Sequence, residues 1–84
     1  MSTNQKPTRT AEETQHLKQL GDNIRAIRQE RGYSQEEFAE VAGFSRSYYT
    51  EIETGKRNIS VLNLIKIVDA LKVDPNNLIR FLQH

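Results

Sequence analysis

Glycines and hydroxyl-bearing residues divide this sequence into short segments, each with the pattern of an α-helix. Ser or Thr stands where most of these helices would begin, and glycine stands where several would end. Between these boundaries apolar residues recur at spacings of three and four, and no segment alternates as a half-buried strand would. The pattern predicts an all-α fold, a compact domain of five short helices around one core.

The helix boundaries follow from local capping signals. Thr10 with Glu13 and Ser34 with Glu37 form capping boxes, and Asp74-Pro75 is a typical start for a last helix. The second and third helices are too short to be stable alone in water, so they must pack against the others. The expected helices span about residues 11–31, 35–42, 46–54, 61–71 and 75–82.

Composition excludes several classes of site. With no cysteine, the chain has no disulfide, thiolate metal site or cysteine nucleophile, and its two histidines, His16 and His84, lie near opposite ends. No nucleophile, base and third group occur at a spacing that suggests an active site. We therefore expect no enzyme activity, no metal, no cofactor and no small-molecule ligand.

The ends of the chain and its hydropathy give further expectations. Residues 1–10 lack apolar periodicity and are expected to form a flexible tail, with one domain over residues 11–84. No apolar run approaches a membrane span, and the N-terminus lacks the apolar core of a signal peptide. The expected location is cytoplasmic, without a membrane partner.

Residues 35–54 contain a distinctive pair of short helices. Ala39 would let the third helix cross the second closely, and Gly43 supplies the positive φ that a tight turn needs. The third helix would then present an outward polar face that can hydrogen-bond to base edges. That face consists of Ser45, Arg46, Ser47, Thr50, Glu51 and Thr54.

Charge limits how such a face could bind nucleic acid. The net charge is only +1, and residues 34–55 contain one basic side chain, Arg46, against five glutamates. Binding by charge alone is therefore excluded, and phosphate contacts must come from flanking cations such as Lys56 and Arg57.

Several short motifs together resemble a known family. The chain from Leu20 to Leu82 is similar to the lambda-repressor/Cro type (XRE-like) helix-turn-helix regulators, and within them to the controller proteins of restriction–modification systems. The motifs that carry the resemblance are Gly32–Ala39, Gly43–Ser45, Ile52–Lys56, Arg46–Tyr48 and Arg57–Ser60.

The resemblance implies a transcriptional regulator that reads a (pseudo)palindromic double-stranded DNA operator with its third helix in the major groove. Gln35 would contact a phosphate, the third helix would meet bases, and the following loop would run along the backbone. It also implies an ion pair between Arg28 and Glu53. The implied DNA contacts are Gln35, Ser45, Arg46, Ser47, Thr50, Glu51, Lys56, Arg57 and Asn58.

Three questions stay open at this point. Glu51 could accept from a cytosine amine or repel phosphate, and Arg57 could contact phosphate or a base, because Ile59 stands where the family often has proline. Tyr48 and Tyr49 could divide between surface and core in either way. The alternative function is a protein–protein module of the same fold, such as an antitoxin.

The C-terminal helix carries more apolar residues than so short a segment is expected to bury on its own domain. We therefore expect a two-fold homodimer built from the fourth and fifth helices. The expected seam residues are Leu78, Phe81 and Leu82.

Overall fold

The computed structural model describes residues 9–82, and these residues form the expected all-helical fold. The described residues contain no β-strand, and none of their helices is long and apolar enough to cross a membrane. The elements are α1 (Ala11–Glu30), α2 (Gln35–Ala42), α3 (Arg46–Glu53), α4 (Val61–Leu71), α5 (Asn76–Ile79) and a 3₁₀ turn, η1 (Arg80–Leu82).

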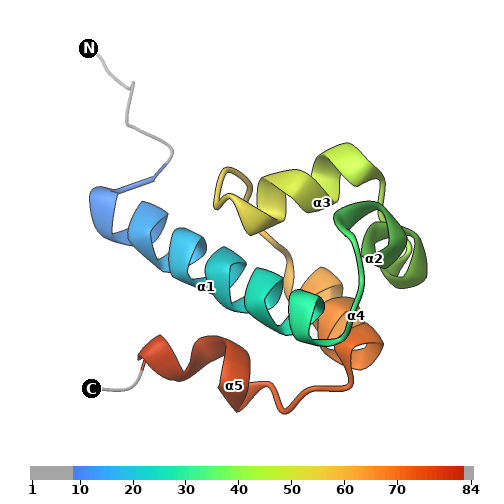
Figure 1. Cartoon of the computed structure of the whole chain (residues 1–84). Coiled ribbons are helices and arrows are strands. Elements are labelled where there is room, and N and C mark those ends of the chain that lie inside the picture. Colours follow the sequence, from blue (N-terminus) through green and yellow to red (C-terminus); the bar gives the residue numbers. More distant parts are fainter. Residues whose placement is uncertain (1–8, 83–84) are drawn as a thin grey trace.

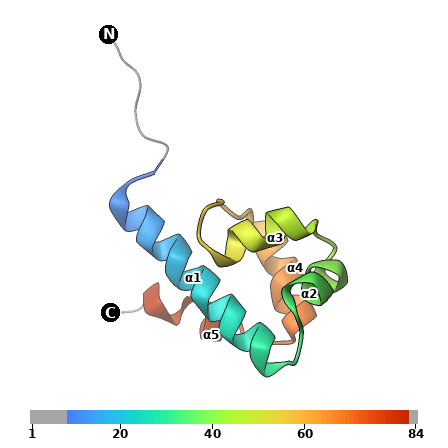
Figure 2. The same cartoon turned by 45° about the horizontal axis from the view of Figure 1, so that its top comes forward.

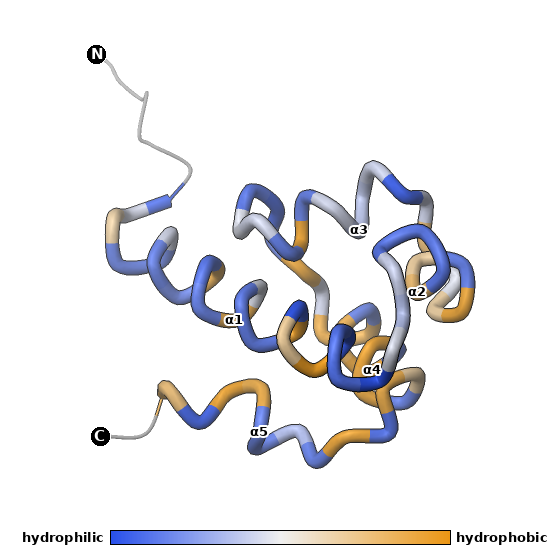
Figure 3. Tube along the Cα trace, viewed as in Figure 1, coloured by the Kyte–Doolittle hydropathy of each residue, from blue (hydrophilic) through white to orange (hydrophobic). Residues whose placement is uncertain are grey.

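The long helix α1 lies between α3 on one side and α5 on the other (Figure 1, Figure 2). The helices α2 and α4 pack at the end where α1 finishes, and α4 and the C-terminal segment carry much of the hydrophobic sequence (Figure 3). All five helices contribute to one core. Its buried apolar residues are Leu20, Ile24, Phe38, Ala39, Ala42, Tyr49, Ile52, Ile67, Leu71 and Leu78.

The capping residues act as the sequence predicts. Both halves of the Thr10–Glu13 box form, with donor–acceptor distances of 3.0 Å. The Ser34–Glu37 box is also complete. Ser45 and Ser60 each accept a backbone amide at the start of α3 and α4. The starts of α1, α2, α3 and α4 are thus determined by residues within three positions of them.

The C-terminal segment differs from its expected form. The predicted helix over 75–82 is the short α5 followed by η1, and the Asp74 carboxylate accepts the Asn76 amide at 3.0 Å. Leu78 is only 1% exposed because it fills the core of its own domain, which corrects its expected place in a dimer seam. Phe81 is half-buried with its ring centroid 6.0 Å from that of His16, whereas Leu82 stays 47% exposed.

The expected flexible tail falls mainly on residues 1–8, which lie outside the described residues, as do residues 83–84 of the expected domain. Arg9 and Thr10, the last two residues of the expected tail, have defined contacts instead. Thr10 caps α1, and Arg9 reaches the carbonyls that follow α3.

Candidate nucleic-acid interface

The C-terminal end of α3 lies directly against the backbone of α1. A Cβ atom on Gly21 would stand 2.4 Å from the Glu53 carbonyl oxygen, so the two helices approach more closely than any other residue would permit. Just after the end of α3, a Cβ atom on Gly55 would stand 2.8 Å from the Cα atom of Lys18 on α1. These two glycines set the position of α3 relative to α1.

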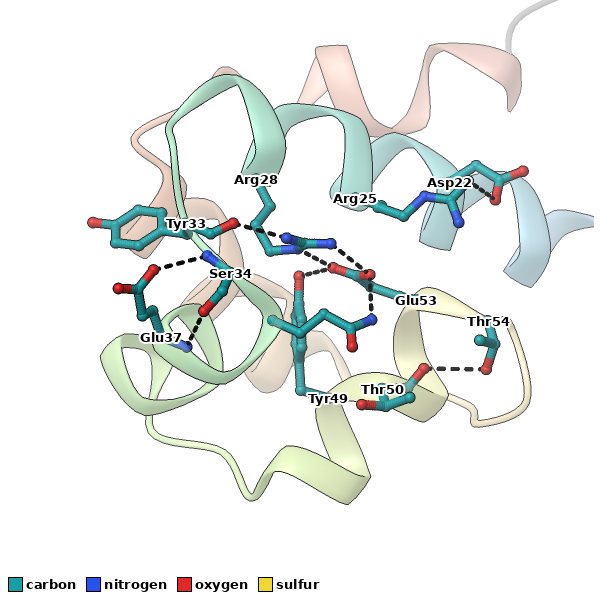
Figure 4. A network of polar contacts seen from close by, with 11 residues as sticks. Asp22, Arg25, Arg28, Tyr33, Ser34, Glu37, Tyr49, Thr50, Glu53 and Thr54 are labelled. Carbon is teal, nitrogen blue, oxygen red and sulfur yellow. Dashed lines mark hydrogen bonds and ion pairs between the residues drawn. The ribbon is translucent and has the colours of Figure 1, made fainter.

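A buried network of hydrogen bonds and one ion pair also joins α1 to the C-terminal end of α3 (Figure 4). The expected ion pair is present: Arg28 Nε donates to Glu53 Oε2 at 2.6 Å and Nη2 donates to Oε1 at 3.2 Å. The Tyr49 hydroxyl also donates to Glu53, and Arg28 Nη1 donates to the Tyr33 carbonyl at 2.8 Å. Arg28 is 6% and Glu53 2% exposed, so the two charges are satisfied by each other and by these bonds.

Proton affinities in this network favour the charged pair. Burial is the largest single influence on Glu53 and raises its pKa, but hydrogen bonds from Arg28, Tyr49 and Gln35 outweigh it, so the pKa is lowered. The hydrogen bond to Glu53 raises the pKa of Arg28 against the opposing effect of burial. Burial, together with the bond to Glu53, raises the pKa of the Tyr49 hydroxyl. Glu53 is therefore a carboxylate at neutral pH.

Gln35 belongs to this network rather than standing free. Its side-chain Nε2 donates to Glu53 Oε1 at 2.9 Å, across the gap between α2 and α3. The sequence had suggested a phosphate contact for this residue. That bond uses one of the two Nε2 hydrogens, so a phosphate contact would use the other one or the backbone N–H of Gln35 at the start of α2.

The two adjacent tyrosines divide between core and surface. Tyr49 is fully buried against Phe38, with ring centroids 5.3 Å apart. Tyr48 is half-buried, packs edge-on against Phe44 and accepts a hydrogen bond from Asn63 Nδ2 at 2.7 Å. Both rings therefore brace α3 against neighbouring helices.

The outer face of α3 is polar and accessible. Ser45, Arg46 and Ser47 are exposed, and Thr50 and Glu51 are partly exposed. The Arg46 side chain makes no hydrogen bond or ion pair with any other residue of the described part, 9–82. The structure thus brings the expected base-contacting residues onto one face and leaves Arg46 free to reach outward.

The loop after α3 adds cations beside that face. Lys56, Arg57 and Asn58 are all exposed. Arg57 is already engaged, because its guanidinium donates to Glu51 Oε1 at 2.6 and 2.9 Å and lies 5.5 Å from the centre of the Tyr48 ring. The carboxylate of Glu51 is therefore neutralised locally, which sequence inspection did not reveal.

Sequence inspection also missed Gly21 and Arg9. A glycine inside a helical apolar pattern weakens the helix and can have a packing reason, so Gly21 carried a usable signal. Arg9 carried none, because the backbone it contacts lies 46 and 47 residues away.

Comparison with known proteins agrees with this geometry. Residues 24–78 match the model of the family described as "Helix-turn-helix". The chain is 40% identical over 63 residues to the control protein C.BamHI of Bacillus amyloliquefaciens, covering 74% of this chain and 78% of that protein. It is 42% identical over 55 residues to the control protein C.MunI of a Mycoplasma species, covering 64% and 74%.

A solved structure has the same fold. The restriction–modification controller protein C.AhdI of Aeromonas hydrophila aligns with a TM-score of 0.71 and 39% identity, over 74% of this chain and 94% of that one. Most of the described fold, including α2, the turn and α3, lies inside the region matched by the family model. This chain therefore belongs to the helix-turn-helix family and is a transcriptional regulator of the controller-like, XRE type.

Proposed function

We propose that this protein binds a specific DNA operator as a homodimer, with α3 of each copy in the major groove. The observation that carries the proposal is the contrast between the two faces of α3. The inner face is fixed by Gly21, Tyr49 and Glu53, and the outer face presents small polar side chains and Arg46, whose side chain bonds to no other residue of the described range 9–82. A rigid helix with accessible donors is what direct reading of base edges requires.

The alternative of a protein–protein module is less well supported by this face. An adhesive surface is expected to expose large apolar or aromatic anchors near its centre. On α3 the only large aromatic or apolar side chain near the surface is Tyr48, and it is half-buried against Phe44 and Asn63.

We assign different roles to two cations. Arg46 lies in the first turn of α3, where its guanidinium could bind both acceptors of a guanine. Lys56 lies in the loop, where it would touch phosphate. Arg46→Ala should therefore lose about 1–3 kcal/mol per half-site and relax preference at one base pair. Lys56→Ala should weaken binding to all sequences and lower the salt slope by roughly one unit.

The experiment begins with footprinting on DNA from the neighbourhood of the protein's own gene, as the likeness to control proteins suggests. Each variant is then titrated against the operator, its single-base variants and unrelated DNA across a salt series. Arg31→Ala serves as control, because Arg31 is exposed and its side chain donates to the carbonyls of Leu71 and Lys72 at the end of α4, outside the proposed DNA contacts. Equal loss on all sequences for Arg46→Ala, with altered base preference for Lys56→Ala, would reverse the assigned roles.

For the homodimer, we propose a seam centred on α4. With Leu78 in the core, the exposed apolar residues next to the DNA-facing loop are Val61, Leu62 and Ile65, which are 73%, 72% and 48% exposed. Phe81 and Leu82 would add to the seam from η1. A two-fold axis there would bring two copies together with their recognition helices roughly 34 Å apart, one turn of DNA.

Leu62→Asp tests the seam because it places a charge in the centre of the patch. Light scattering at tens of micromolar should show a dimer for the parent and a monomer for the variant. Val41→Asp is the matched control: Val41 is 55% exposed on α2 and shares a hollow with Lys66 and Asp69 of α4, not with Val61 or Leu62 at its start. A parent protein that is monomeric, and that binds one copy per operator, would contradict the homodimer.

A further inference from the structure

Arg9 joins the start of α1 to the loop that follows α3. Its Nη1 donates to the Gly55 carbonyl at 3.0 Å and its Nη2 donates to the Lys56 carbonyl at 3.3 Å. The neighbouring capping box of Thr10 and Glu13 fixes the backbone from which this side chain extends. The two amino groups of one guanidinium thus bind two successive carbonyls.

The backbone at this point is held from three directions. The Gly55 amide donates to the Ile52 carbonyl at 3.1 Å and the Lys56 amide donates to the Glu51 carbonyl at 2.9 Å, which is the Schellman arrangement for a helix end. Gly55 also lies against the α1 backbone at Lys18. Arg9 takes the remaining backbone groups, the carbonyls, so both polar backbone groups of Lys56 are engaged while its side chain stays exposed.

The same residues surround a surface hollow lined by Arg9, Glu51, Lys56, Arg57 and Asn58. Three of the five carry positive charge, and the single carboxylate, Glu51, is paired with Arg57 at 2.6 Å. Such a hollow suits a phosphate group if its loop keeps one conformation.

We propose that Arg9 is a positioning residue for DNA binding: it holds the backbone of Lys56 so that the loop presents its side chains to a DNA phosphate. The inference rests on the proposed function, in which Lys56 is the phosphate contact. Arg9 acts through the loop and need not touch DNA.

A double-mutant cycle between Arg9→Ala and Lys56→Ala tests this role on the operator and on unrelated DNA. Arg9→Ala removes the charge-assisted hydrogen bonds to the loop. It should therefore weaken binding to the operator and to unrelated DNA by roughly three- to tenfold and lower the salt slope. If Arg9 acts through Lys56, the double variant should bind within about twofold of Lys56→Ala alone. Arg9→Lys, which keeps a cationic donor, should recover part of the loss.

The matched control is Arg31→Ala, which removes a similar pair of hydrogen bonds, from one guanidinium to two successive carbonyls, elsewhere in the fold. Arg31 Nε donates to the Leu71 carbonyl at 2.9 Å and Nη2 to the Lys72 carbonyl at 3.4 Å, at the end of α4. Affinity per folded molecule should not change in this variant. A second readout needs no DNA: ¹⁵N relaxation should report greater motion of the Lys56–Asn58 amides in Arg9→Ala but not in Arg31→Ala.

The outcomes separate this inference from the proposed function. If Arg9→Ala and Lys56→Ala weaken binding by factors that multiply, Arg9 contacts phosphate itself and the positioning role is wrong. If Lys56→Ala weakens binding and Arg9→Ala changes neither affinity nor loop motion, the inference fails while the proposed function stands. If the parent protein shows no salt-dependent DNA binding, the proposed function itself fails.

Discussion

The two sides of α1 are built differently. Toward α3, the backbones nearly touch at Gly21, and a buried ion pair joins Arg28 to Glu53. Toward α5, the described residues contain one side-chain hydrogen bond, from Asn23 Nδ2 to the Leu78 carbonyl at 2.8 Å. The α5 side also has the buried Leu78 side chain and a tilted contact between the rings of His16 and Phe81. The α3 side is specified by sterics and charge together, whereas the α5 side depends on a few replaceable contacts.

The largest loss should come from removing the carboxylate on the α3 side. Glu53→Ala leaves the Arg28 charge buried and also removes the acceptor of Tyr49 and Gln35. We expect a loss of about 3–5 kcal/mol in the free energy of unfolding, measured by urea denaturation. Glu40→Ala, an exposed glutamate on α2, should stay within about 0.5 kcal/mol. A Glu53→Ala protein as stable as the control would show that the network contributes nothing.

Gly21→Ala tests the close approach of α1 and α3. Whether the substitution raises or lowers the free energy of unfolding is itself informative. Helix propensity alone would stabilise α1 by about 1 kcal/mol. The added Cβ would meet the Ile52 and Glu53 carbonyls, which are backbone atoms that cannot move aside, so we expect a net loss of about 1–3 kcal/mol. Ala26→Gly at an exposed site of the same helix calibrates the propensity effect. Thermal melts showing a stabilised Gly21→Ala variant would contradict the close contact.

Protonating Glu53 should produce a smaller effect than deleting it. Because the folded-state pKa lies below the usual 4.5, the contribution of Glu53 is complete above pH 4.5 and is lost as the pH falls through the lower folded-state value. Other carboxylates titrate in the same range. The measurement is therefore the difference in unfolding free energy between the parent and Glu53→Gln from pH 7 to pH 2. That difference should shrink with acid; a constant difference would mean that the Glu53 pKa is not lowered.

The smallest effect should come from the α5 side. Asn23→Ala removes one hydrogen bond and leaves the Leu78 carbonyl near the surface, so we expect a loss of about 1 kcal/mol. Asn77→Ala, on α5 itself and exposed, serves as control. A loss from Asn23→Ala equal to that from Glu53→Ala would remove the contrast between the two sides.

The same contrast explains what could be predicted from the sequence. Helix starts depend on pairs three residues apart, such as Ser34 and Glu37, so inspection finds them. The placement of Leu78 could not be found this way, because an apolar stripe does not reveal whether it faces its own core or a partner.

Only part of the candidate site could be predicted from the sequence. The outer face of α3 followed from helical spacing, and the residues expected there do share that face. The partners of Gln35 and Arg57 did not follow, because they depend on how α2 and the loop sit against α3. Side-chain partners joined only by the tertiary fold leave no local pattern.

The helices α2 and α3 are only eight residues long each, and this length links the stability of the core to the number of functional protein molecules in a cell. Neither helix would persist by itself, so the polar outer face of α3, which we propose reads DNA, exists only in molecules whose core is assembled. A substitution that weakens the core away from α3 would therefore lower the number of competent molecules in a cell without altering the complexes that the remaining ones form. Gene output under such a regulator would respond to core substitutions much as it responds to the amount of protein synthesised.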